Sequence, residues 1–177
     1  MRTPITINWI VKEHISFFNK HGVTEAALRK YHSEYPHKKN IYSDNDFLWG
    51  LFQQFVLEIG RQTTNLEDYY TYNIELYKRM RDFLVLIEDK NPNHIVKQIN
   101  KNELELRKLS SMYLFNLEIV AINCCPECEK LNGKIISLDD AIENQFLPPK
   151  KCTNRYGCSC FYCELPIRDL GGNLVKC

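Results

Sequence analysis

The residues with the clearest chemistry in this chain are its cysteines. Seven of the eight lie within the forty residues from Cys124 to Cys163, and the eighth is Cys177. Thiols concentrated in this way need a shared reason. In a chain without an export signal the thiols stay reduced, so a bound metal is favoured over a framework of disulfides.

Five of these cysteines are candidate ligands of one tetrahedral ion. Cys125 and Cys128 are separated by two residues, a spacing that lets one turn present two thiolates while its backbone N–H groups hydrogen-bond to the sulfurs. Cys152 is the candidate third ligand. The spacing leaves open whether Cys158 or Cys160 is the fourth, and at least one nearby cysteine then stays free because a tetrahedral ion takes four ligands.

Two other cysteines in this stretch are less suited to the same ion. Cys163 repeats the two-residue spacing with Cys160, but Phe161 and Tyr162 between them are bulkier than the small or polar residues usual in such a turn. Cys124 points away from the pair if residues 118–124 form a strand, since neighbouring side chains in a strand alternate in direction.

A site of four thiolates has no open position for water, so it is structural and not catalytic. Four sulfur ligands suit zinc first, and iron is the alternative. We therefore expect one structural zinc ion.

The elements that must position these cysteines follow a change of pattern near residue 118. Before it, apolar residues recur at helical spacing, and caps and breaks divide the chain into about five helices. The first has Thr3 as cap and Pro4 in its first turn. The second is capped by Thr24 and stops at Pro36, and the third opens with Ser43 and Asp46 as a capping box. The fourth and fifth are predicted over about residues 66–89 and 94–117.

After Leu117 the residues predict a small mixed module. Strands are expected over residues 118–122 and 134–136, and a third begins at residues 161–162. Asn132-Gly133 supplies a hairpin turn, and Ser137 with Asp140 opens a short helix over about 138–144. The predicted fold is mainly α: an N-terminal helical bundle over residues 1–117 and a small C-terminal α+β zinc-knuckle module over residues 118–177.

The order of motifs over about residues 118–162 resembles the C-terminal domain of phage head morphogenesis proteins, the Mu F-like minor head proteins. The matching residues are Cys125, Cys128, Leu131, Asn132, Gly133, Lys134, Pro148, Pro149, Cys158 and Cys160. The chain departs from the family pattern in having Cys152 at the place of a histidine, and in a longer gap from there to Cys158. The resemblance implies protein–protein contacts with phage or prophage components, and association with the virion if a phage encodes the chain.

Composition bounds the other function classes. The 23 basic and 22 acidic residues leave no field to attract nucleic acid or an anionic membrane. No apolar run approaches the length of a membrane span, and Asn8, Lys12 and Glu13 interrupt the apolar start that a signal peptide needs, which predicts a cytoplasmic protein.

No metalloprotease, phosphate-loop or serine-hydrolase motif is present, which favours a non-enzymatic protein acting through protein partners. Two alternatives remain open. One is a zinc-finger-type nucleic-acid-binding protein, and the other is an enzyme or toxin with an unrecognised site in the helical region.

Overall fold

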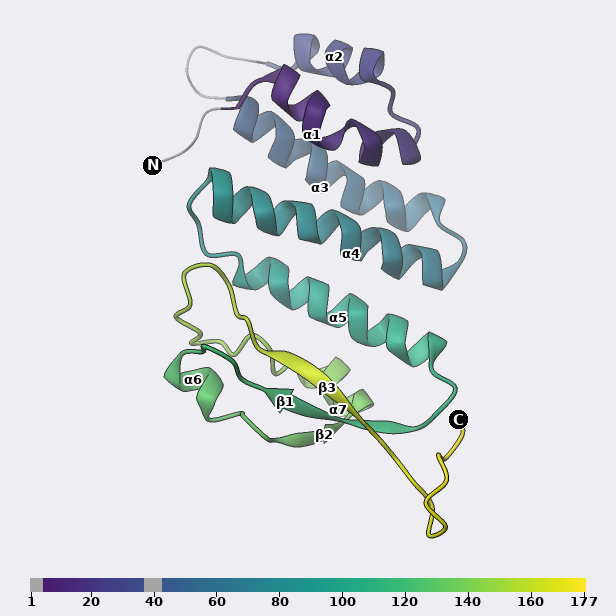
Figure 1. Ribbon diagram of the computed structural model, residues 1–177. Helices are drawn as coiled ribbons and strands as arrows, with labels where there is room; N and C mark the ends of the chain where they lie inside the picture. Colours follow the sequence, from purple (N-terminus) through teal and green to yellow (C-terminus); the bar gives the residue numbers. More distant parts are fainter. Residues whose placement is uncertain (1–4, 37–42) are drawn as a thin grey trace.

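The computed structural model describes residues 5–36 and 43–177 and is mainly helical, as predicted (Figure 1). The helical region consists of α1 (Ile7–Lys20), α2 (Glu25–Glu34), α3 (Asp44–Gln62), α4 (Leu66–Asp82), the π-helix η1 (Phe83–Ile87) and α5 (Asn93–Ser110). The C-terminal part consists of β1 (Phe115–Val120), α6 (Pro126–Glu129), β2 (Ile135–Ser137), α7 (Leu138–Asn144) and β3 (Phe161–Pro166).

Side-chain caps begin most of the predicted helices. The Thr24 hydroxyl accepts the Ala27 N–H at α2, and Ser43 and Asp46 form both bonds of a capping box at α3. At α1 the expected start was too early. Thr6 caps this helix, which begins at Ile7, while the expected cap Thr3 and first-turn Pro4 lie outside the described residues.

The fourth and fifth helices end differently from the prediction. α4 stops at Asp82, and the chain continues as the wider turns of η1. α5 ends at Ser110 instead of residue 117. The Ser111 side chain accepts the Tyr113 N–H and donates to the Tyr113 carbonyl oxygen. These two backbone groups would have formed helical hydrogen bonds if α5 had continued. Leu117, expected on the fifth helix, lies in β1 and is fully buried there.

The helices stack as successive layers, with α5 between the other helices and the sheet (Figure 1). A first buried cluster, here called the helical core, draws on α1 to α5 and η1. Its members are Ile5, Ile10, Val11, Phe17, Phe18, Leu28, Phe47, Leu48, Leu51, Phe52, Phe55, Ile59, Leu76, Met80, Phe83, Leu84, Ile95 and Ile99. No helix in the described part of the chain is long and apolar enough to cross a membrane.

The three strands form an antiparallel sheet in the order β2-β1-β3. Leu117 pairs with Ile136 on one side and with Glu164 on the other, so β1 is the central strand. A second buried cluster, here called the C-terminal core, includes residues of all three strands. It contains Leu104, Leu117, Ile119, Cys125, Cys128, Ile136, Ala141, Leu147, Cys160 and Tyr162.

Helix α5 contributes to both clusters, with Ile95 and Ile99 in the helical core and Leu104 in the C-terminal core. The division expected at residue 118 falls inside β1, which begins at Phe115. The two parts therefore share a helix, and no linker separates them.

Candidate metal centre

The connection between β1 and β2 carries the first cysteine pair. Cys125 is the N-cap of α6, and Cys128 lies within that single turn. After this pair in the sequence, the Asn132 side chain accepts the Ala121 N–H at 2.8 Å, and Gly133 has a φ of +74°. The Asn-Gly turn expected from the sequence therefore closes the hairpin beside the cysteines.

The chain between α7 and β3 carries the other candidates. The Cys152 N–H donates to the Pro149 carbonyl oxygen, Gly157 has a φ of +97°, and Cys160 directly precedes β3. These residues return to the hairpin because β3 pairs with β1 along the edge opposite β2. The sheet topology thus brings the two halves of the cysteine sequence together.

The sulfur atoms converge on Cys128. Its Sγ lies 3.6 Å from Cys125 Sγ, 3.8 Å from Cys152 Sγ and 3.5 Å from Cys158 Sγ. Zinc–sulfur bonds of about 2.3 Å in a tetrahedron place neighbouring sulfurs about 3.8 Å apart. The three distances are close to the edges of such a tetrahedron.

All five predicted cysteines take part in this arrangement. Cys125, Cys128 and Cys152 form one group with sulfurs within 4.8 Å of one another, and Cys128, Cys158 and Cys160 form a second. The groups share Cys128, which is almost fully buried. These cysteine groups could hold a metal ion, and a tetrahedral ion would leave one of the five sulfurs unbound.

The other three cysteines lie outside both groups. The Cys124 thiol donates to Glu129 Oε2 at 3.1 Å, and this hydrogen bond, with burial and the carboxylate charge, raises its pKa to about 11. Cys163 and Cys177 are exposed. All eight cysteines are free thiols, so the described residues contain no disulfide.

The surroundings favour the charged thiolate at Cys125 and the neutral thiol at Cys128 and Cys158. Backbone N–H groups of Thr153 and Cys128 point at Cys125 Sγ and lower its pKa to about 6, against the opposite effect of burial. Burial raises the pKa of Cys128, and it raises that of Cys158 to about 12. Several thiolates gathered in this space need a cation to compensate their charge. The donor set consists of sulfur atoms alone, which suits zinc or iron.

One contributor to this site was missed from the sequence. Asn91-Pro92-Asn93 predicts a turn, but the two asparagine side chains also form hydrogen bonds with the backbone of residues 152–158. Asn91 Nδ2 donates to the Asn154 carbonyl oxygen, and Asn93 contacts both Cys152 and Cys158. The available signal was a pair of amides flanking a proline at a helix start, which does not identify a partner some sixty residues away.

Comparison of the chain with protein-family models, with curated proteins and with solved structures finds no match.

Proposed function

We propose that the C-terminal part of this chain is organised by one structural zinc ion, in a non-enzymatic protein that acts through contacts with protein partners. Cys125, Cys128 and Cys152 supply three thiolates, and Cys158 or Cys160 supplies the fourth. The observation that supports this proposal is the set of sulfur–sulfur distances of 3.5–3.8 Å around Cys128, which joins both halves of the cysteine sequence.

A structural role follows from the number and type of ligands. Four thiolates fill the coordination sphere of zinc and leave no position for a reacting water. The C-terminal core is small, and three of its ten buried members are cysteines. Zinc modules of this size gain roughly 10–16 kcal/mol from the metal, which is large compared with what so few apolar side chains provide.

The proposed partner class follows from the resemblance to phage head morphogenesis proteins over residues 118–162. Those proteins suggest a phage or prophage component as the partner, and the chain's near-zero net charge argues against nucleic acid as the main ligand. If the chain is phage-encoded, we expect mass spectrometry to find it in purified heads or head-assembly intermediates. Its absence from both would contradict the assembly role and leave the zinc proposal standing.

The metal proposal is tested by elemental analysis of the pure protein with two matched cysteine variants. We expect about one zinc per chain in the wild type, a loss of most of it in Cys128→Ser, and full retention in Cys163→Ser. Cys128 is at the centre of the sulfur groups, whereas Cys163 is exposed and belongs to neither.

Less than about half an equivalent of zinc in the wild type would contradict the proposal. Iron in place of zinc would retain the structural site and correct the metal. Equal zinc content in the two variants would show that the bound ion is not held by this cysteine group.

A further inference from the structure

The side chain of Asn93, the first residue of α5, bridges two of the candidate zinc ligands. Its Nδ2 donates to the Cys152 carbonyl oxygen at 3.2 Å, and its Oδ1 accepts the Cys158 N–H at 2.9 Å. We propose that Asn93 is a positioning residue of the metal centre, and that zinc binding is thereby coupled to the docking of residues 152–158, here called the cysteine loop, on the helical region. This inference rests on the proposed zinc site.

Contacts within the helical region hold Asn93 in place independently of the loop. Its N–H donates to Asn91 Oδ1 at 2.8 Å, and it begins a helix whose Ile95 is buried in the helical core. The N-cap residue, Pro92, makes no side-chain cap hydrogen bond, and the Asn93 amide is directed to the cysteine loop. An amide carries an NH₂ donor group and an oxygen acceptor on a short stem, and it can therefore bond the Cys152 carbonyl oxygen and the Cys158 N–H at the same time.

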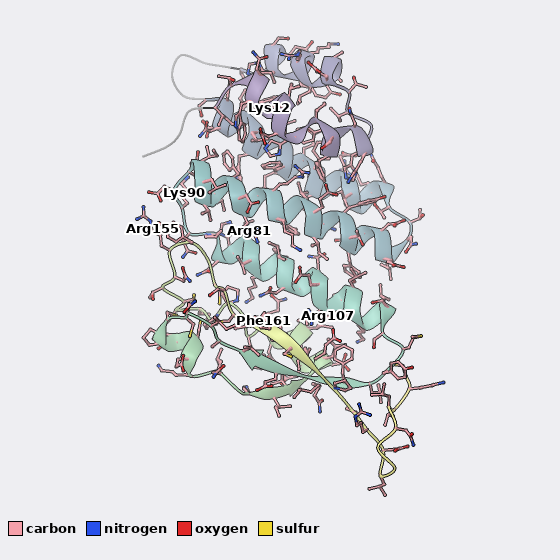
Figure 2. The ribbon with its side chains drawn as sticks, viewed as in Figure 1. Lys12, Arg81, Lys90, Arg107, Arg155 and Phe161 are labelled. Carbon is pink, nitrogen blue, oxygen red and sulfur yellow. The ribbon has the colours of Figure 1, made fainter. Side chains whose placement is uncertain are left out.

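Three further contacts press the same loop against the turn between η1 and α5. Asn91 Nδ2 donates to the Asn154 carbonyl oxygen at 2.7 Å, and Arg155 forms an ion pair with Asp89. Figure 2 shows Arg155 beside this turn, next to the labelled Lys90. Gly157 packs so closely on Pro92 and Val96 that a Cβ there would lie 3.0 Å from Pro92 Cγ.

The coupling acts in both directions. Residues that orient ligands from behind typically change metal affinity 10- to 100-fold when removed, because the ligands then lose order that binding must restore. By linkage, an ion that holds Cys152 and Cys158 also holds the loop on α5. The loop is thus docked more firmly in the metal-loaded protein than in the metal-free protein.

The test compares Asn93→Ala with Asn100→Ala in the full chain. Asn100 is a matched control, since it lies on the same helix and its Nδ2 donates to a backbone oxygen of the C-terminal part, that of Leu147, at 3.1 Å, and not to the backbone of a cysteine. With a chromogenic chelator as competitor, we expect zinc affinity to fall about 10- to 100-fold in Asn93→Ala. In Asn100→Ala it should stay within about twofold of the wild type.

A second measurement separates positioning from general stability. We expect Asn93→Ala to lower the melting temperature of the zinc-loaded protein more than that of the metal-free protein, whereas Asn100→Ala lowers both equally. If Asn93→Ala does not fold, Asn93→Asp serves in its place, because it keeps the acceptor for the Cys158 N–H and removes the donor to Cys152.

If the wild type binds zinc and the Asn93 and Asn100 variants bind it with equal affinity, the positioning role of Asn93 is overturned. A wild type without bound metal would overturn this inference together with the proposed function. The two failures are therefore distinguished by the metal content of the unmodified protein.

Discussion

His14 is a titratable side chain inside the helical region and belongs to its packing. Its ring meets those of Trp9 and Phe52 edge-on, each with centroids 5.4 Å apart, and its Nδ1 lies 3.4 Å from Arg79 Nη1. The buried Nε2 has no hydrogen-bond partner among the described residues. Burial first, and then the Arg79 charge, lower the pKa of His14 to about 4. The imidazole is therefore neutral in the folded protein at neutral pH.

This burial predicts a loss of stability in mild acid. The pKa of His14 is about 4 when folded and 6.5 in the reference state, so between these values the unfolded chain binds more protons than the folded chain. The contribution is intact above about pH 6.5 and declines as the pH falls toward 4. Between pH 7 and pH 4.5, about 2 kcal/mol of the free energy of unfolding should be lost through this group.

Urea unfolding at the two pH values measures this loss in His14→Gln and in a control, His94→Gln. Glutamine does not titrate, so His14→Gln should lose about 2 kcal/mol less than the wild type on acidification. His94 is exposed on α5, and its variant should follow the wild type. Equal losses in all three proteins would show that His14 is not the group responsible.

At the scale of elements, the cysteine loop depends on one glycine. Gly157 has a left-handed φ of +97° and lies against Pro92 and Val96 at the start of α5. Gly22, at the end of α1, shares the left-handed conformation with a φ of +78°, but an added Cβ there would meet none of the described atoms within 4 Å. The same substitution at Gly22 and Gly157 therefore separates the cost of a left-handed backbone from the cost of crowding neighbouring atoms.

We expect Gly157→Ala to lower the free energy of unfolding by about 3 kcal/mol, and Gly22→Ala by about 1 kcal/mol. The excess at Gly157 arises because its new methyl group must displace Pro92, which closes the turn before α5. Urea unfolding of the metal-loaded variants measures both values. A Gly157→Ala loss no larger than that of Gly22→Ala would contradict the close docking of the loop.

The elements that could be predicted from the sequence are those set by local chemistry. Thr24 and the Ser43–Asp46 pair located the starts of α2 and α3, and Ser137 located α7, because a cap is decided within four residues. The end of α5 was missed because apolar residues up to Leu117 continue its helical spacing beyond Ser110. Pairing of β1 on both sides outweighs that spacing, and a single segment does not reveal its distant partners.

The same distinction holds for the metal centre. The gathering of Cys125, Cys128 and Cys152 could be predicted, since spacing and residue type define a tetrahedral thiolate site. The central place of Cys128 between two sulfur groups, and the role of Asn93, depend on how the cysteine loop docks on α5. That docking joins residues about sixty positions apart, which no local pattern encodes.

At the scale of the whole molecule, the two cores differ in what stabilises them. The helical core contains no cysteine, and the two tryptophans, Trp9 and Trp49, pack against it. The C-terminal core includes Cys125, Cys128 and Cys160. Removal of metal should therefore loosen the C-terminal part while most of the helical region remains folded.

This difference is tested by treating the protein with a chelator. We expect protease cleavage to increase within residues 121–163, while tryptophan emission and most of the helical circular dichroism remain unchanged. Cys128→Ser should behave like the chelated wild type, and Cys163→Ser like the untreated protein. A red shift of tryptophan emission that accompanies metal loss would instead show that the whole chain unfolds as one unit.

The sheet order β2-β1-β3 also has a consequence for synthesis on the ribosome. The nascent chain can form the β1–β2 hairpin with Cys125 and Cys128 first. Cys152 is not made until 24 residues after Cys128, and β3 is made later still. Until then β1 has one unpaired edge, and two thiolates can capture a cation without enclosing it. Completion of the sheet and of the cysteine groups thus waits until β3 has been translated.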